Sequence, residues 1–452
     1  NNQDRYLTMS HVFPRHTKAN IPTAVGGEGC YLIDSNGKRY FDGSGGAAVS
    51  CLGHGDPDII AAVQEQVAKL EFAHTGFLTS EPAEELADLL IEHAPGDLDR
   101  VYFVSGGSEA TEAAIKLARQ YFVEKDEPDR RHIIARRQSY HGNTLGALAA
   151  GGNELRRQQF APLLIDIKHI APCYEYADKH EGESSFDYGQ RVAQELEDEI
   201  LRLGSDTVMA FMAEPVVGAT SGAVPAVEGY FKRIREICDT YGVLLIFDEV
   251  MCGMGRTGHM FACDADNVSP DILCIAKGLG AGYQPIGAML CSAQIYSVIE
   301  NGSGFFQHGH TYLGHPVATA AGLAVVKALL NRGLIERSKV MGEKLQAALL
   351  AQFGQHPHVG DIRGRGLFRG IELVENRETK KPFDPKFSIA KRIKKAAFEA
   401  GLICYPMSGT RDGKLGDHVL LAPPFILNDE QVDEVVTKLS HAIDTALQGV
   451  NV

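Results

Sequence analysis

The clearest pattern in the chain is a series of short apolar runs between residues 101 and 291. They are VYFV (101–104), HIIA (132–135), IDIKHI (165–170), VMAFMA (208–213), VLLIF (243–247), ILCIA (272–276) and IGAMLC (286–291). Because most of these runs are apolar throughout rather than alternating with polar residues, they are typical of strands covered on both faces of a sheet. Segments with helical periodicity separate them, such as EGYFKRIREICDTYG. The alternation predicts an α/β domain with a mainly parallel, doubly wound sheet.

The two ends of the chain show a different pattern. Residues 30–42, CYLIDSNGKRYFD, predict a hairpin with its turn at SNG. The segments expected after residue 316 are a long helix, GLFRGIEL, a helix through 387–400, GLICYP, HVLLAPP and a last helix from Asn428. We therefore expect two domains, which are a large α/β domain at 56–319 and a smaller α+β domain built from 1–55 and 320–452.

Composition and charge narrow the classes of function. The 452 residues carry a formal net charge of -14, which argues against nucleic acid as a partner because phosphate binding needs a clustered basic surface. The nine cysteines form no C-x-x-C pair, so we expect free thiols in a reducing compartment and no metal site. No secretory signal pattern and no apolar run long enough to span a bilayer is found. The expected location is the cytoplasm, without a membrane partner.

Candidate functional residues follow the ends of the predicted strands, where ligands collect in open α/β sheets. SGGS (105–108) leads into a helix and suits an anion, although a small-residue helix cap explains it equally well. Tyr140 follows HIIA, and core packing is its alternative explanation. Asp248 and Glu249 end VLLIF, where buried carboxylates need a partner. Metal ligation is one explanation, although no histidine stands nearby at metal-ligand spacing, and a cationic nitrogen on a bound cofactor is another.

Lys277 ends the run ILCIA and is followed by glycines at 278, 280 and 282. A lysine at a strand end most often extends its ammonium group to solvent. Here it shares the predicted edge of the sheet with SGGS, Tyr140 and Asp248. Pyridoxal phosphate requires this set, because the lysine amine condenses with its aldehyde and the acid keeps its ring nitrogen protonated. We expect the glycines to leave room for the cofactor and for movement of the lysine.

A second motif competes with this interpretation. Residues 253–258, GMGRTG, match the G-x-G-x-x-G pattern of dinucleotide-binding folds. That pattern also requires a helix at the last glycine and an acid at the end of the next strand. HMFACDADNVSP follows instead, without helical periodicity, and Lys277 ends the next strand. The nicotinamide interpretation is therefore disfavoured.

Over nearly its whole length the sequence resembles the class III pyridoxal-phosphate aminotransferases, particularly the ω-aminotransferases. The motifs are GGSEATEAAIKLAR (106–119), YHGNT (140–144), EPVVG (214–218), FDEVMCGMGRTG (247–258), AKGLGAGYQPIGA (276–288), HGHTYLGHP (308–316) and LAPPF (421–425). The resemblance implies fold type I and a ping-pong transfer of an amino group from an ω-amino acid or amine to pyruvate or a similar oxo-acid. A decarboxylase or aminomutase on the same fold, or a catalytically silent binding protein, are the alternatives.

The resemblance also implies roles around the cofactor. Lys277 would bind its aldehyde and then act as general base, which requires a lowered pKa. Asp248 would pair with the pyridinium nitrogen. Tyr140 would stack on one face of the ring and Val250 would contact the other.

Phosphate binding and assembly are implied in the same way. The backbone at Gly107 and Ser108, with the serine hydroxyl, would hold the phosphate. Thr311 would reach the phosphate in the site of the neighbouring subunit, because family members are homodimers with shared sites. Leu313 stands where many relatives carry a small polar residue, and we expect this difference to be harmless.

Substrate recognition is the last expectation that the resemblance supplies. Arg411 is the candidate for a mobile arginine that pairs with substrate carboxylates, and an exposed loop arginine beside Asp412 is the alternative. Glu214 resembles the family acid that lies near the substrate and can pair with such an arginine. Ala47 and Ala48 stand where several relatives carry larger side chains, which favours a wider pocket and longer or bulkier amines.

Overall fold

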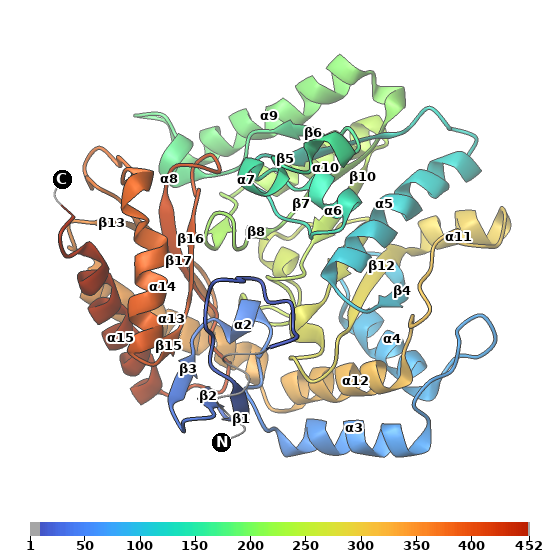
Figure 1. Ribbon diagram of the computed structural model, residues 1–452. Coiled ribbons are helices and arrows are strands. Elements are labelled where there is room, and N and C mark those ends of the chain that lie inside the picture. The colour runs from blue at the N-terminus through green and yellow to red at the C-terminus, as the bar shows by residue number, and fades with distance from the viewer. Residues whose placement is uncertain (1–9, 451–452) are drawn as a thin grey trace.

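The computed structural model describes residues 10–450 and contains a central sheet of seven strands (Figure 1). The strand order is β4-β12-β11-β10-β7-β5-β6. The strands are β4 (Leu98–Val104), β5 (His132–Arg136), β6 (Lys168–Ile170), β7 (Val208–Ala213), β10 (Leu244–Asp248), β11 (Ile272–Ile275) and β12 (Gly287–Ser292). All neighbours pair parallel except β12, which is antiparallel to β11 and to β4. The predicted mainly parallel α/β sheet is confirmed.

Helices cover both faces of this sheet, which explains why its inner strands β7, β10 and β11 are almost wholly apolar. In β10, Leu244 and Ile246 belong to the same buried cluster as the inner side of α5 (Gly107–Glu124). Leu245 and Phe247 belong to the cluster that contains α9 (Ser185–Leu203) and α10 (Tyr230–Tyr241). Because successive side chains of a strand point to opposite faces, each face has its own helical layer (Figure 1).

Two strands differ from the sequence expectation in informative ways. The run IDIKHI forms a strand only over its last three residues, β6, which lies at the edge of the sheet and pairs with β5 alone. IGAMLC forms β12, which runs against its neighbours. β4, β5, β7, β10 and β11 therefore end at one edge of the sheet, and β12 begins there.

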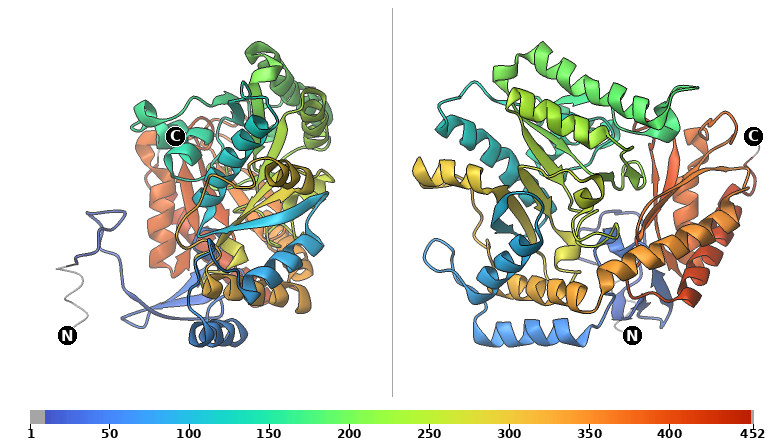
Figure 2. Two further views of the ribbon diagram at one scale, coloured as in Figure 1. Left: turned by 90° about the vertical axis from the view of Figure 1, so that its right-hand side faces the viewer. Right: turned by 180° about the vertical axis from the view of Figure 1, so that it is seen from behind.

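Two further sheets of four strands come from the terminal parts of the chain, and one of them combines both ends (Figure 2). One has the order β1-β2-β3-β15, so its last strand comes from the C-terminal part of the chain. The other has the order β13-β14-β17-β16. The strands are β1 (Ala24–Glu28), β2 (Tyr31–Asp34), β3 (Arg39–Asp42), β13 (Val359–Arg365), β14 (Phe368–Leu373), β15 (Leu402–Ile403), β16 (Tyr405–Ser408) and β17 (Asp417–Leu421). A short pair, β8 (Val216–Val217) and β9 (Val224–Pro225), follows β7. The domain limits at 55/56 and 319/320 stay predictions.

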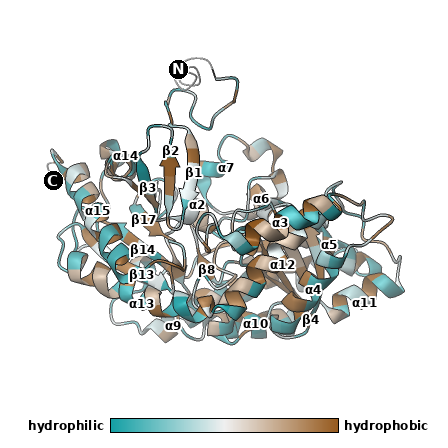
Figure 3. Ribbon diagram, turned by 90° about the horizontal axis from the view of Figure 1, so that it is seen from below, coloured by the Kyte–Doolittle hydropathy of each residue, from teal (hydrophilic) through white to brown (hydrophobic). Residues whose placement is uncertain are grey.

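The remaining helices surround these sheets. They are α2 (Gly45–Ala48), α3 (Pro57–Lys69), α4 (Glu81–His93), α6 (Leu145–Ala150), α7 (Glu154–Arg157), α8 (Glu175–Asp178), α11 (Ala293–Asn301), α12 (Pro316–Asn331), α13 (Leu334–Phe353), α14 (Ile389–Glu399) and α15 (Asp429–Leu447). Hydrophilic and hydrophobic residues both occur in α13 and α15 (Figure 3). In α15 the buried residues recur every three or four positions, as on the inner face of an amphipathic helix. Within residues 10–450, no single helix has the length and apolarity to cross a bilayer. α12 and α13 meet those criteria only together, across a bend of 66°.

Local sequence explains where several elements begin. α15 starts after Asn428, whose side chain and that of Gln431 form a reciprocal capping box.

The G-x-G-x-x-G segment after β10 forms turns and leads to a 3-10 turn at Ala262–Asp266, not to a helix. Its Arg256 is buried and donates to the carbonyl groups of Leu367 and Pro423, which ties these turns to the C-terminal region. The segment therefore connects the central sheet with the C-terminal region and lacks the helix that a dinucleotide site requires.

Candidate active site

A cavity of about 930 Å³ opens at the edge where the central strands end. Seven of the predicted site residues line it, namely Gly107, Ser108, Tyr140, Glu214, Asp248, Val250 and Lys277. They come from segments that follow five different strands, which meet only in the folded sheet. The chain ends add Arg15, Ala47 and Tyr405 to the lining. The cavity therefore lies where the sheet and the terminal regions meet.

Lys277 follows β11 in a left-handed backbone conformation, with φ of 45°. Such a conformation is uncommon outside glycine and costs of order 1 kcal/mol, a form of strain that clusters at functional sites. Burial lowers the pKa of Lys277, while the nearby Asp248 carboxylate acts in the opposite direction. The side chain is half-buried and makes no hydrogen bond or ion pair with another residue of 10–450. It can therefore present a neutral amine to the cavity.

The glycines after Lys277 serve mainly to allow close packing. A Cβ at Gly278 would lie 3.3 Å from Met254 Cβ, and one at Gly280 would lie 2.7 Å from the carbonyl oxygen of Gln284. Of these three glycines, only Gly282 lines the cavity. The expectation that all three leave room for the cofactor is therefore corrected, because Gly278 and Gly280 are surrounded by protein atoms.

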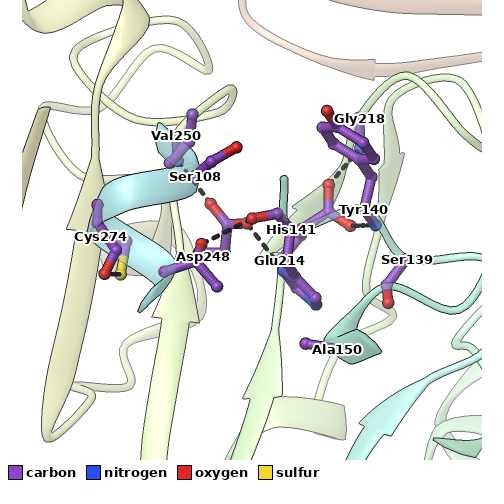
Figure 4. A network of polar contacts seen from close by, with 12 residues as sticks. Ser108, Ser139, Tyr140, His141, Ala150, Glu214, Gly218, Asp248, Val250 and Cys274 are labelled. Atoms are coloured by element: carbon purple, nitrogen blue, oxygen red, sulfur yellow. Dashed lines mark hydrogen bonds and ion pairs between the residues drawn. The ribbon is translucent and has the colours of Figure 1, made fainter. Parts of the chain in front are cut away.

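Asp248 is buried and held by two contacts (Figure 4). Its Oδ1 accepts a hydrogen bond from the Val250 backbone N–H at 2.9 Å, and its Oδ2 lies 2.8 Å from His141 Nδ1. His141 is also buried, and its Nε2 has no partner within residues 10–450. These contacts fix the orientation of the carboxylate and leave it facing the cavity as an acceptor for a protonated ring nitrogen.

Glu214 lies beside Tyr140 at the other side of this network (Figure 4). Its two carboxylate oxygens accept hydrogen bonds from the backbone N–H groups of Tyr140 and Gly218, both at 3.0 Å. Burial raises the pKa of Glu214 to about 7; the Asp248 charge also raises it, and His141 opposes. Glu214 is thus committed to holding the loop that carries the Tyr140 ring.

The start of α5 forms an anion-binding surface. The first backbone N–H groups of a helix lack intrahelical partners and carry a positive partial charge. Ser108 Oγ accepts from the Asn143 backbone N–H at 2.9 Å, which joins α5 to the loop after β5. A Cβ at Gly107 would lie 2.7 Å from Val250 Cγ1, and one at Gly142 would lie 2.6 Å from Ser108 Oγ. Both glycines therefore permit close approach around this surface.

Arg411 does not line the cavity, in contrast to the expected substrate contact. Its Nε donates to Glu372 Oε2 at 2.6 Å, and its Nη2 donates to the carbonyl of Lys380. Burial would raise the pKa of Glu372, but Arg363 and Arg411 hold it below its usual range. The side chain pairs neither with Glu214 nor with Asp412, so both sequence interpretations of its pairing differ from the structure. The physical reason is the fully buried carboxylate of Glu372, which requires cationic partners.

Two other predicted residues also lie outside the cavity lining. Ala48 is buried in a small apolar cluster with Cys252 and Phe368, so only Ala47 of the pair faces the cavity. The cause is the kinked backbone of α2, in which Ala48 has φ of 62°. Thr311 is exposed on the surface, which leaves its expected contact with a neighbouring subunit as a prediction.

The residues present fit pyridoxal phosphate. The cavity has a half-buried lysine with a lowered pKa, a buried acid oriented by histidine, an aromatic ring and a helix start cleared by glycines. Lys277 would hold the aldehyde carbon, Asp248 the ring nitrogen, and the start of α5 with Ser108 the phosphate. Tyr140 and Val250 would flank the ring.

Comparisons with known proteins agree with this fit. The family model "Aminotransferase class-III" matches residues 13–443. An uncharacterised aminotransferase of Schizosaccharomyces pombe is 45% identical over 445 residues, which cover 98% of this chain and 97% of that protein. The chloroplastic gamma aminobutyrate transaminase 3 of Solanum lycopersicum is 36% identical, over 92% of this chain and 79% of its own. The crystal structure of the omega transaminase from Pseudomonas jessenii in complex with PMP superposes with a TM-score of 0.91 at 32% identity, covering 99% of this chain and 98% of that one.

A fold type I architecture with this site defines a pyridoxal-phosphate-dependent transferase. The chain belongs to the class III aminotransferase family. It is an enzyme of amino-group transfer that uses pyridoxal 5'-phosphate, as the resemblance implied. The nicotinamide alternative is thereby excluded.

Four charged or aromatic residues that line the cavity had no role predicted from the sequence. His141 stands next to Tyr140 in YHGNT, and a histidine after a strand end, opposite a buried acid, could have been recognised. Arg15, Arg156 and Tyr405 gave no comparable signal, because they come from segments remote from the strand ends. Their place in the cavity depends on tertiary structure alone.

Proposed function

We propose that the chain transfers the amino group of an amine or ω-amino acid to pyruvate or a similar oxo-acid in this cavity. The observation that carries the proposal is that Lys277, Asp248 and Tyr140 line a single cavity. The bound cofactor supplies an electron sink for the charge that develops at the reacting carbon. Names of the relatives support the donor class, since one is a gamma aminobutyrate transaminase and another an omega transaminase.

Lys277 moves the proton in this proposal. Its neutral Nζ accepts the proton from the carbon that bears the substrate amino group and returns one on the opposite half of the cycle. The lowered pKa keeps this amine neutral at a lower pH than an exposed lysine. Asp248, held by His141 and the Val250 N–H, keeps the proton on the cofactor ring nitrogen.

The proposed active form is a homodimer in the cytoplasm, and a tetramer made of two such dimers is the alternative. Exposed aromatic and aliphatic side chains support an interface around the α3–α4 loop and residues 305–312, since Phe77 is 86% and Tyr312 61% exposed. The Phe72 and Tyr312 rings lie 5.5 Å apart, so these two segments form one surface. Thr311 lies on it, where it could reach a neighbouring site. Nine free, buried cysteines are consistent with a reducing compartment.

A half-reaction assay tests the proposal. Purified enzyme mixed with an amine donor should lose the visible absorbance of its bound cofactor, and pyruvate should restore it and yield alanine. Lys277→Ala should abolish both changes, whereas Lys327→Ala, on an exposed surface of α12, should leave them intact. Release of carbon dioxide without alanine would instead favour a decarboxylase. Protein that stays colourless with added pyridoxal phosphate would exclude a catalytic cofactor site.

A further inference from the structure

Arg156 occupies a position that suits recognition of a substrate anion. It lies in α7, whose first turn is capped by Asn153, and it lines the same cavity as Lys277. Its guanidinium carbon lies 4.7 Å from the centre of the Tyr140 ring. Stacking on an aromatic ring orients the planar guanidinium group and leaves its N–H edge available. A cation is therefore held next to the ring that is proposed to flank the cofactor.

Within residues 10–450, Arg156 makes no ion pair with an acidic side chain. Its Nε is buried without a hydrogen-bond partner. In the described part of the chain, its one side-chain hydrogen bond runs from Nη2 to Met407 Sδ at 4.0 Å, and a thioether is a weak acceptor. A guanidinium group that lacks strong acceptors in a partly buried cavity favours an incoming anion.

Two other arginines, the sequence neighbour Arg157 and the expected substrate contact Arg411, differ from Arg156 because protein groups already bind their guanidinium groups. Arg157 donates to the carbonyl groups of Leu148, Ala149 and Gly151, so it closes the end of α6. Arg411 is engaged by the buried carboxylate of Glu372 outside the cavity. Contacts within the protein therefore explain the presence of Arg157 and Arg411, and no comparable contact explains Arg156.

The acids of the cavity are also engaged. Both oxygens of Glu214 accept backbone hydrogen bonds, and those of Asp248 contact the Val250 N–H and His141. Neither carboxylate is within ion-pair distance of Arg156. The positive charge on this side of the cavity is thus free to bind a carboxylate that arrives with the substrate.

We propose that Arg156 binds the carboxylate of the oxo-acid acceptor and of amino-acid donors, and so determines specificity for carboxylated substrates. This inference rests on the proposed function, and it assigns to Arg156 the role that the sequence resemblance gave to Arg411. Arg15, which also lines the cavity, is the competing cation. It is exposed, so its charge is screened more strongly by solvent.

The test compares ligands that differ only in the carboxylate. Single half-reactions of the holoenzyme are followed with 4-aminobutyrate and with butylamine. Arg156→Met keeps an unbranched stem over Tyr140 and removes the charge. We expect it to raise the KM for 4-aminobutyrate by about 10- to 100-fold, the range for loss of a charge-assisted hydrogen bond, with a much smaller change for butylamine. Arg156→Lys should restore part of the loss, and Arg137→Met, on an exposed arginine, should have no effect.

Binding of butyrate separates this inference from the proposed function. Butyrate has no amino group, so its affinity for the holoenzyme, measured calorimetrically, does not depend on transamination. If butyrate binds and Arg156→Met weakens it by about 10-fold or more, the inference stands even where amino transfer to pyruvate fails. Equal losses for butylamine and 4-aminobutyrate, or a carboxylate-specific loss confined to Arg15→Met or Arg411→Ala, would overturn it.

Discussion

At the scale of single residues, the site combines two unfavourable features at Lys277. Its backbone has φ of 45°, and its amine is partly buried against the sheet edge. Both features reduce the stability of the folded chain, and both serve the chemistry, since the backbone aims the side chain into the cavity and burial lowers the pKa of the amine. The cost should therefore be measurable in the cofactor-free protein.

Lys277→Met should stabilise the cofactor-free enzyme at neutral pH. The variant keeps the backbone and most of the stem but removes the titrating amine. The unfolded chain keeps the ordinary pKa of 10.5 while the folded pKa is lowered, so the unfolded wild type binds the proton more tightly. The destabilisation is complete below the folded pKa and vanishes above the unfolded one. The melting temperature of the variant should exceed that of wild type at pH 7, with a gap that narrows toward pH 10.5. A gap that widens with pH would contradict this account.

Arg411→Ala should lower stability without changing substrate preference. Glu372 would keep Arg363 at 2.8 Å but lose the Arg411 Nε contact, and the cost of weakening a buried charged hydrogen bond is about 1–3 kcal/mol. Urea denaturation measures that cost, and Arg411→Lys should recover part of it. In half-reactions, 4-aminobutyrate and butylamine should be affected alike. A loss specific to 4-aminobutyrate would show that Arg411 leaves Glu372 and enters the cavity.

At the scale of elements, the phosphate surface depends on the contact between the start of α5 and the loop from β5 to α6. Ser108 Oγ, the Asn143 N–H and Gly142 form this contact. Thr111 adds a second link, because its hydroxyl donates to the carbonyl of His141. The loop that carries Tyr140 and His141 is thereby fixed to the helix whose N-terminus would bind the phosphate.

Gly142→Ala should weaken cofactor binding more than it weakens the fold. The new Cβ would lie 2.6 Å from Ser108 Oγ and 2.9 Å from Ala147 Cβ, so Ser108 must move. We expect affinity for pyridoxal phosphate to fall by about 10-fold, as for the loss of one strong hydrogen bond. Gly182→Ala is the matched control, because Gly182 also has positive φ but a Cβ added there would have nothing within 4 Å. Absorbance titration of both variants gives the comparison, and equal affinities would refute the proposed role of this contact.

At the scale of the whole molecule, one cavity receives residues from nearly the full length of the chain. Arg15 and Tyr405 are separated by most of the sequence, and both line it with residues of the central sheet. The terminal regions reach it because β15 completes the sheet begun by β1, β2 and β3. Assembly into a dimer would add Thr311 from a second chain.

Subunit complementation tests that shared site. In a purified heterodimer of one Lys277→Ala chain and one Thr311→Glu chain, a site that takes Thr311 from its neighbour combines both defects in one cavity. The other cavity is then intact, and about half of the wild-type activity should remain. Each homodimer should be strongly impaired. The Lys277→Ala homodimer lacks the lysine in both cavities, and in the Thr311→Glu homodimer the glutamate repels the phosphate in both. An inactive heterodimer would contradict the shared site, because it would mean that Thr311 serves the cavity of its own chain and that each cavity carries one of the two defects.

Much of the site could be predicted because its functional residues directly follow strands that the sequence pattern predicts. Tyr140, Asp248 and Lys277 each follow an apolar run, and the carboxyl ends of parallel strands meet at one edge. Arg411 and Ala48 were expected from the resemblance and not from strand ends, and the structure places both outside the cavity lining. The partner of Arg411, Glu372, lies on β14, and the direction of Ala48 depends on the kink in α2. Neither the pairing nor the kink has a local sequence pattern.

By itself, the sequence determined the layered sheet, the residues at its edge, and the cofactor that a lysine and an acid there require. These follow from burial on two faces and from chain direction, which are properties of local segments. Tertiary structure alone decided which cations line the cavity. Arg411 is drawn to a buried carboxylate, while Arg156 stands over Tyr140, 251 residues from its contact Met407, without a strong acceptor. The interaction between two charges depends on their distance in the folded structure, so the sequence alone does not show which cationic side chain lacks an acidic partner.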